Sequence, residues 1–140
     1  MESVRLNNTT ILVIEDNLVC QALIRAFLRG TGANLVMAGS GDEARKVLGK
    51  SPIDVVLTDM RLPDTSGMEL LKEIKEHNPE IPVIVQTAAS IDFSEEECLK
   101  AGCDGYITKP YTRSQFLDTI TCALGNKGGP PGMSASPPSR

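Results

Sequence analysis

Carboxylates, a lysine and a threonine stand at the ends of short apolar segments in this sequence. Glu15 and Asp16 close the first segment, Asp59 closes the third, Thr87 closes the fourth, and Lys109 follows the fifth. The three carboxylates among them offer only oxygen ligands, and Mg²⁺ suits such a set better than Ca²⁺, because Mg²⁺ is commonly held by one or two carboxylates and keeps several waters. With a metal, a lysine and a hydroxyl around it, one carboxylate is equipped to accept a phosphoryl group as a nucleophile.

These side chains can meet only if the apolar segments that precede them are strands of one sheet. Five such segments alternate with five patterns of helical period; the segments span 10–15, 33–38, 53–59, 81–87 and 104–108. The first, third and fourth are rich in Val and Ile and almost continuously apolar, which is typical of parallel strands covered on both faces. The alternation predicts an α/β fold: a flavodoxin-like, doubly wound, five-stranded parallel sheet in the order 2-1-3-4-5 with five helices.

In that order the first and third strands are neighbours, and their carboxyl ends share one edge of the sheet. Glu15, Asp16 and Asp59 are therefore expected to converge at this edge. Like charges at short range repel each other unless a positive charge lies among them. Lys109, delivered by the fifth strand, is one available cation, and a bound divalent metal ion is the other.

Start and stop signals support the helical segments. Asp16 or Asn17 can open the first helix, and four pairs fit a capping box: Ser40 with Glu43, Ser66 with Glu69, Ser94 with Glu97, and Thr112 with Gln115. Helix ends are expected at Gly30, Gly49 and Gly102. The spacing in the first helix predicts a buried face formed by Val19, Ala22, Leu23, Ala26 and Phe27.

Composition describes an ordinary globular domain. The 140 residues are 41% hydrophobic and carry a net charge of −4, which argues against a direct nucleic-acid partner. No apolar run approaches the roughly 20 residues that span a bilayer, and the N-terminus lacks the apolar segment of a signal peptide, so we expect a cytoplasmic protein without a membrane partner. Four cysteines without a CxxC pair lack zinc-site spacing, and we expect them to be small buried residues or surface thiols.

Four motifs stand in order along the chain: ILVIEDN, VVLTDMRLPDTSG, VIVQTAA and GYITKP. At this spacing they resemble the response-regulator receiver domain, the phosphoacceptor half of two-component signalling. The resemblance covers roughly residues 9–124, which we expect to form the folded domain. Residues 1–8 would be a short N-terminal extension, and the Gly-, Pro- and Ser-rich residues 125–140 a disordered tail or linker.

The resemblance implies a role for each residue of the metal and phosphate site. Asp59 would accept the phosphoryl group, Asp16 would ligate Mg²⁺ directly, and Glu15 would ligate it through a water. The backbone carbonyl of Arg61 would be a further metal ligand. Because Arg61 is a long cation at a position that flanks the phosphoryl group in the family, we expect its side chain to affect water access and the lifetime of the phosphate.

The resemblance also implies which residues respond to the phosphate. Thr87 would hydrogen-bond one phosphoryl oxygen, helped by the backbone N–H of Ala88, and Lys109 would pair with another. The peptide bond between Lys109 and Pro110 would be cis. Tyr106 would be an aromatic switch that turns inward when Thr87 moves; a plain core aromatic is the alternative interpretation of Tyr106.

The expected partners follow from the same resemblance. A phosphohistidine on a histidine kinase or a histidine phosphotransfer protein would dock near the first helix and the loop after the fifth strand. Phosphorylation would then change the surface of helix 4, strand 5 and helix 5 for a downstream output protein or domain, or for a homodimer. The domain would finally hydrolyse its own phosphate, and would not be a turnover enzyme. We favour a stand-alone or N-terminal receiver slightly over the receiver of a hybrid histidine kinase.

Three other functions fit the sequence less well. A phosphohydrolase of the haloacid-dehalogenase type would carry a second acid two residues after its nucleophile, where this chain has Arg61. A flavin-binding module would need a phosphate-holding loop after the first strand, where Glu15 and Asp16 would repel a phosphate. A degenerate receiver would have lost Asp59, Lys109 or the acidic pair. His77, the single histidine, is expected to be an exposed helix-end residue and not a phosphodonor.

Overall fold

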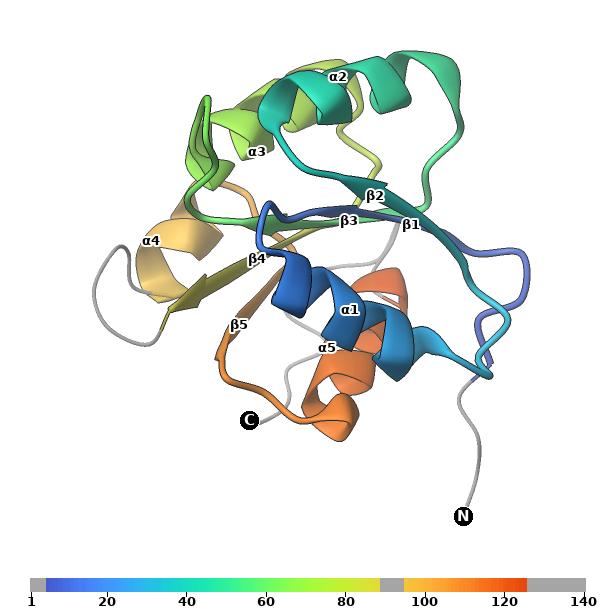
Figure 1. Ribbon diagram of the computed structural model, residues 1–140. Coiled ribbons are helices and arrows are strands. Elements are labelled where there is room, and N and C mark those ends of the chain that lie inside the picture. The colour runs from blue at the N-terminus through green and yellow to red at the C-terminus, as the bar shows by residue number, and fades with distance from the viewer. Residues whose placement is uncertain (1–4, 89–94, 126–140) are drawn as a thin grey trace.

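The computed structural model describes residues 5–88 and 95–125, in which strands and helices alternate along the chain (Figure 1). The strands are β1 (Thr10–Ile14), β2 (Asn34–Ala38), β3 (Val55–Asp59), β4 (Val83–Ala88) and β5 (Gly105–Lys109). The helices are α1 (Leu18–Leu28), α2 (Gly41–Lys50), α3 (Gly67–His77), α4 (Glu95–Lys100) and α5 (Arg113–Gly125). The strands pair in parallel in the order β2-β1-β3-β4-β5, which confirms the predicted flavodoxin-like sheet.

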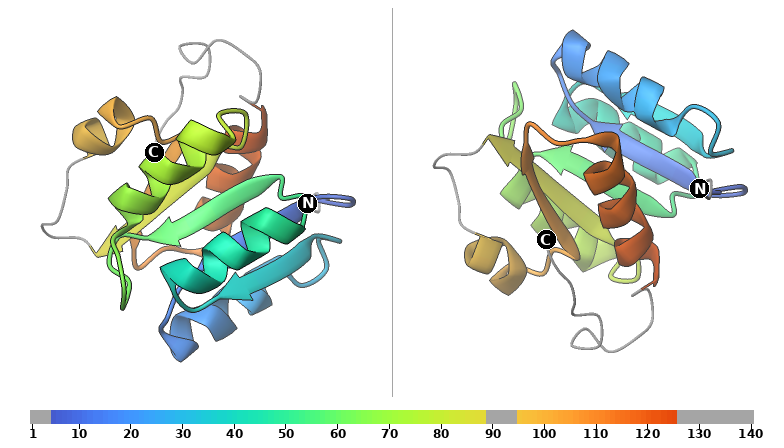
Figure 2. Two further views of the ribbon diagram at one scale, coloured as in Figure 1. Left: turned by 90° about the horizontal axis from the view of Figure 1, so that it is seen from above. Right: turned by 90° about the horizontal axis from the view of Figure 1, so that it is seen from below.

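Helices cover both faces of the sheet. α2, α3 and α4 pack on one face, and α1 and α5 pack on the other (Figures 1 and 2). Alternate residues of a strand therefore enter different apolar cores. In β1, Leu12 and Ile14 belong to the core under α2, α3 and α4, whereas Ile11 and Val13 belong to the core under α1 and α5. This two-sided burial explains the almost continuous apolar character of the strand segments.

Side-chain caps begin several helices where the sequence predicts them. The Asn17 side chain accepts a hydrogen bond from the backbone of the first turn of α1. Thr112 and Gln115 form a complete capping box before α5, in which each side chain accepts the backbone N–H of the other residue. The Ser66 hydroxyl caps α3 in the same way as Asn17 caps α1. Ser94, the predicted cap of α4, lies outside the described residues.

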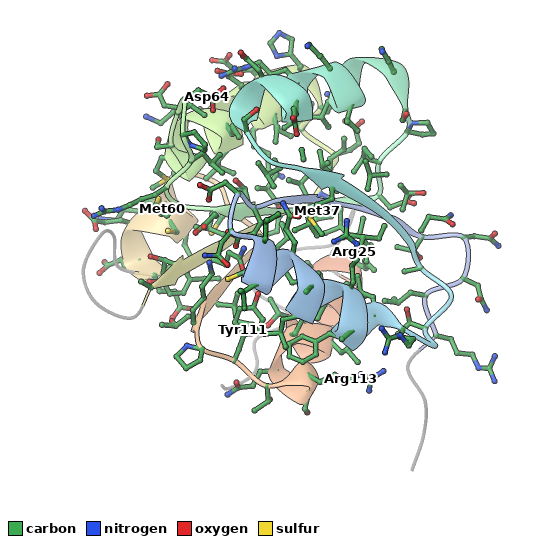
Figure 3. All side chains as sticks on the ribbon, in the orientation of Figure 1. Arg25, Met37, Met60, Asp64, Tyr111 and Arg113 are labelled. Carbon is green, nitrogen blue, oxygen red and sulfur yellow. The ribbon has the colours of Figure 1, made fainter. Side chains whose placement is uncertain are left out.

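The start of α2 departs from the predicted capping box. The Ser40 hydroxyl accepts the N–H of Glu43, as predicted, but the Glu43 carboxylate accepts the N–H of Gly39 and not that of Ser40. The carboxylate of Asp64, from the loop after β3, accepts the first two N–H groups of α2 at 2.8 and 2.9 Å. Asp64 thus ties the loop that follows Asp59 to the start of α2 (Figure 3).

Two of the three glycines predicted to end helices do so. Gly30 and Gly102 follow α1 and α4 with φ angles of 83° and 105°, a left-handed conformation that glycine adopts without strain. Gly49 instead lies inside α2, which runs on to Lys50. The Ser51 N–H bonds to the Val47 carbonyl, so backbone hydrogen bonding continues past the glycine.

The predicted buried face of α1 is wrong for several of its members. Val19 and Leu23 are exposed, whereas Ile24 and Leu28 are buried and Phe27 packs against the core. The helix sequence LVCQALIRAFL is apolar nearly all round. The spacing of apolar residues therefore could not select which side of α1 faces the sheet.

The N-terminal residues that the structure describes contribute to the domain core. Leu6 is buried in the core under α1 and α5, and its N–H donates to the Thr31 carbonyl at 2.6 Å. The tail predicted beyond the fold lies almost wholly outside the described residues.

Other expectations from composition can be checked on the described residues. The four cysteines are free thiols, of which Cys98 and Cys103 are buried and Cys122 is exposed. His77 is exposed in the last turn of α3. No helix in the described part of the chain has the length and apolar character needed to cross a bilayer.

Candidate functional site

The predicted acidic residues lie together at the carboxyl edge of the sheet. Glu15 and Asp16 follow β1, and Asp59 ends β3, the neighbouring strand. One carboxylate oxygen from each of these residues lies within 4.8 Å of the others. A set that offers only oxygen ligands from carboxylates, with Asp16 open to solvent, fits a hard divalent cation that keeps part of its water shell.

Glu15 is fully buried, and its carboxylate has hydrogen-bond donors on both oxygens. Its Oε2 accepts the Asn17 N–H at 2.9 Å. Its Oε1 accepts hydrogen bonds from Lys109 Nζ and from Gln86 Nε2, each at 2.9 Å. Because a buried carboxylate is costly without such partners, these donors are what hold a charged side chain at the end of β1.

Lys109 connects the acids electrostatically. Its Nζ lies 2.9 Å from Glu15 Oε1 and 3.3 Å from Asp59 Oδ2. Burial on its own would lower the pKa of Lys109, but the hydrogen bond to Glu15 and attraction by Asp59 raise it above its ordinary value. Lys109 therefore remains a cation across the physiological pH range.

Among the described residues, Asp59 has two hydrogen-bond donors, one fewer than Glu15. Its Oδ1 accepts the Met60 N–H at 2.9 Å, and its Oδ2 faces Lys109. Burial and repulsion by Glu15, opposed in part by Lys109, raise the pKa of Asp59 to about 6. The carboxyl is therefore predominantly ionised at neutral pH, although its surroundings disfavour the charge.

A family model described as the response regulator receiver domain matches residues 11–121. The chain belongs to this family.

Relatives of this receiver domain occur in proteins of different length. It is 37% identical over 118 residues to the transcriptional regulatory protein ZraR of Escherichia coli, a match that covers 84% of this chain and 27% of ZraR. It is 33% identical over 119 residues to the polar-differentiation response regulator DivK of Brucella ovis, covering 84% of this chain and 97% of DivK. The chain thus spans about a quarter of the length of ZraR but nearly the whole of DivK.

Solved structures share the fold. A response regulator receiver domain from Clostridium thermocellum superposes with a TM-score of 0.78 at 33% identity, covering 86% of this chain and 97% of that one. The receiver domain of a sensor histidine kinase from Pseudomonas aeruginosa superposes with a TM-score of 0.75 at 31% identity, covering 84% and 98%. That domain was crystallised with a magnesium ion coordinated in its active site cleft.

The residues expected to respond to phosphate lie on the two strands beyond β3. Thr87 is buried near the end of β4, and its hydroxyl donates to the Ala88 carbonyl at 3.2 Å. Ala88 ends β4 and pairs with Lys109 of β5. Tyr106, also on β5, is half-buried against the core under α2, α3 and α4. Residues 89–94, which follow Ala88, lie outside the described residues.

The chain makes a tight turn between the end of β3 and the start of α3, next to the acidic residues. Arg61 is exposed and forms an isolated bridge with Ser66. The Gly67 N–H donates to the Met60 carbonyl at 2.7 Å, and a Cβ on Gly67 would collide with the Asp59 carbonyl oxygen. A glycine at the start of α3 therefore lets the chain turn back closely beneath Asp59. The Lys109–Pro110 peptide bond is cis.

The sequence reasoning missed two residues of the receiver site. Gln86, fully buried in β4, donates from Nε2 to Glu15, and its Oε1 accepts a hydrogen bond from the Tyr111 hydroxyl at 2.5 Å. Burial, opposed in part by the Lys109 charge, raises the pKa of Tyr111, so its hydroxyl keeps the proton that it donates. A signal was present: Gln86 is an amide within an otherwise apolar strand, and a buried amide requires partners.

Proposed function

We propose that this receiver domain accepts a phosphoryl group from a phosphohistidine on Asp59. The observation that carries the proposal is the position of the Asp59 carboxylate, which lies within 4.8 Å of the oxygens of Glu15 and Asp16 and 3.3 Å from Lys109 Nζ. An ionised carboxylate flanked by a cation-binding acidic pair and a lysine has the groups that phosphoryl transfer requires.

In this reaction an Asp59 carboxylate oxygen attacks the phosphorus. The new bond joins that oxygen to phosphorus, the phosphorus–nitrogen bond of the phosphohistidine breaks, and its electron pair stays on the imidazole. No proton has to be removed from Asp59, because its carboxyl is already ionised at neutral pH. Glu15, Asp16, Asp59 and the backbone carbonyl of Arg61 would hold Mg²⁺, which when bound neutralises charge on the transferring group.

The phosphorylated state would be read out through residues on β4 and β5. Lys109 turns from the carboxylates to a phosphoryl oxygen, while the Thr87 hydroxyl and the Ala88 N–H bind others. Movement of Thr87 vacates space for Tyr106 and biases the surface of α4, β5 and α5 toward a downstream protein, an output domain or a second copy. Water then hydrolyses the acyl phosphate, so the domain is a resetting switch and not a turnover enzyme.

Exposed apolar residues on α1 support a docking site for the phosphodonor. Leu18, Val19 and Leu23 are 78%, 77% and 44% exposed. α1 begins directly after the acidic pair, so a helical histidine kinase or phosphotransfer protein seated on these residues would present its histidine to Asp59. Val19 and Leu23 are four residues apart and so share one face of α1, and neighbouring exposed apolar side chains are a feature of interaction surfaces.

The likeness to DivK over 97% of its length supports a stand-alone receiver, and the likeness to 27% of the longer ZraR supports a receiver that is one part of a longer regulator, such as its N-terminal domain. We expect either form to act in the cytoplasm. The receiver of a hybrid histidine kinase is the second candidate, which the likeness to the Pseudomonas aeruginosa kinase receiver supports.

Intact-protein mass spectrometry tests the proposal. After incubation with acetyl phosphate and Mg²⁺, we expect an adduct of about 80 Da that is absent in EDTA and absent from the Asp59→Asn variant. Asp54→Asn is the matched control, because Asp54 directly precedes β3 at the end remote from Asp59, where its carboxylate accepts the Thr10 N–H. An adduct that persists in Asp59→Asn, or no adduct on the unaltered chain, would refute the proposal.

A further inference from the structure

Gln86 links the acidic edge of the sheet to an aromatic cluster below it. Its Nε2 donates to Glu15 Oε1 at 2.9 Å, and its Oε1 accepts from the Tyr111 hydroxyl at 2.5 Å. Gln86 and Glu15 are fully buried. The amide therefore bridges a buried charge and a side chain that is distant in sequence.

The orientation of this amide follows from its partners. An ionised carboxylate can only accept hydrogen bonds, so the NH₂ group of Gln86 must face Glu15. The amide oxygen then faces Tyr111, whose hydroxyl must donate. If the amide were reversed, its oxygen would face the Glu15 carboxylate, and two hydrogen-bond acceptors would meet with no donor between them.

Aromatic packing keeps Tyr111 in place. Its ring stacks on Phe116 of α5 with centroids 5.8 Å apart and an interplanar angle of 16°, and it lies 6.2 Å from the ring of Phe27 of α1. Figure 3 shows Tyr111 on the side of the sheet where α1 and α5 lie. A hydroxyl carried by a packed ring is a fixed donor, and it fixes the Gln86 amide in turn.

We propose that Gln86 is a positioning residue that keeps Glu15 hydrogen-bonded when Lys109 leaves it for a phosphoryl group. This inference rests on the proposed function, in which Lys109 changes partners. Lys109 Nζ and Gln86 Nε2 bind the same oxygen, Oε1 of Glu15.

Burial of Glu15 makes the shared oxygen important. Glu15 has no exposed surface in this structure, so bulk solvent is a poor replacement for the Lys109 donor when Lys109 turns away. A buried charged acceptor without a donor is strongly unfavourable. Gln86 remains on Oε1 after Lys109 has left, so it lowers the cost of the change of partner and holds Glu15 in its metal-binding position.

Beryllium fluoride, a mimic of the phosphoryl group, separates this role from simple packing. In Gln86→Met, Lys109 still satisfies Glu15 before the mimic binds, so the affinity for Mg²⁺ alone, measured by titration calorimetry, is expected to stay within about threefold. The affinity for beryllium fluoride at saturating Mg²⁺, measured by ¹⁹F NMR, is expected to fall by about tenfold or more. In this variant, Lys109 must leave Glu15 Oε1 without either of its side-chain donors.

Thr31→Val is the matched control. The Thr31 hydroxyl makes a buried 2.6 Å hydrogen bond to the Leu28 carbonyl just before β2, at the end of the strands remote from the acids. Its loss should lower stability to urea without changing either affinity. If Gln86→Met is too unstable to assay, Tyr111→Phe is the deciding variant, because it removes the hydrogen bond that fixes the Gln86 amide. It should lower the affinity for beryllium fluoride without lowering the affinity for Mg²⁺, and by a smaller factor than Gln86→Met.

Wild-type affinity for beryllium fluoride in Gln86→Met would overturn the inference. So would a loss of Mg²⁺ and beryllium fluoride affinity by the same factor, which would indicate a packing role alone. Failure of the unaltered chain to bind beryllium fluoride with Mg²⁺ would instead contradict the proposed function itself.

Discussion

The Asp59→Asn substitution is expected to stabilise the folded domain at neutral pH, although it removes half of an ion pair. Burial and the neighbouring Glu15 charge raise the pKa of Asp59 from 3.8 to about 6. The folded state therefore binds a proton on Asp59 more tightly than the unfolded chain does. Ionised Asp59 is thus a source of instability, which a neutral isostere removes.

The size of the effect follows from the change in pKa. One pKa unit corresponds to about 1.4 kcal/mol, so ionisation of Asp59 costs the folded state about 3 kcal/mol above pH 6. The raised pKa already includes the attraction by Lys109, and Lys109 keeps its 2.9 Å contact with Glu15 in the variant. Because solvent screens a partly buried carboxylate, we expect Asp59→Asn to raise the free energy of unfolding by less than this, about 2 kcal/mol, at pH 7.5.

The difference in stability between the two proteins should depend on pH. Below pH 3.8, the value for the unfolded chain, Asp59 is protonated in both states and the two proteins should differ little. The advantage of the variant should grow between pH 4 and pH 6 and stay constant above that range.

Urea unfolding in EDTA, followed by far-UV circular dichroism because the chain has no tryptophan, measures this difference. Adding Mg²⁺ should reduce the difference in unfolding free energy between the two proteins, since the metal would stabilise the unaltered chain, with Asp59, more than the variant. A variant less stable than the unaltered chain at pH 7.5, or a gap that does not shrink toward pH 4, would refute the reasoning.

Three further substitutions test other parts of the site. Lys109→Met should lower the free energy of unfolding by about 3 kcal/mol at pH 7.5, because it leaves buried Glu15 without its cation; a loss below about 0.5 kcal/mol in urea would contradict this. Arg61→Ala should change the rate of autodephosphorylation severalfold by opening water access, and equal decay of the aspartyl phosphate in both proteins would end that idea. Thr112→Ala should lower stability by about 1 kcal/mol through loss of the α5 cap, with no change in the rate of phosphorylation by acetyl phosphate.

The arrangement of the acids could be predicted because few alternatives exist. Strands that are apolar on both faces must form a covered parallel sheet, and the residues after their carboxyl ends then share one edge. That is why Glu15, Asp16 and Asp59 meet where their spacing in the sequence suggested. Short signals also sufficed for local features, such as the cap at Asn17 and the complete capping box at Thr112.

Other features depend on contacts between elements, which spacing does not encode. α1 is apolar on nearly every side, so packing against α5 and the sheet, and not periodicity, buries Ile24 and leaves Val19 exposed. The Gln86 bridge requires β4 to bring its side chain to Glu15 and the loop after β5 to bring Tyr111 to Gln86. Gln86 was visible as a polar residue in an apolar strand, but its partners were not.

Locating the phosphoryl group tests the central claim most directly. Borohydride reduction converts an aspartyl phosphate to homoserine, which peptide mass spectrometry assigns to one residue. After treatment with acetyl phosphate and Mg²⁺, we predict homoserine at position 59 and at no other aspartate. Homoserine at Asp16 or Asp64, or intact aspartate throughout the reduced chain, would contradict the assignment of Asp59 as the phosphoacceptor.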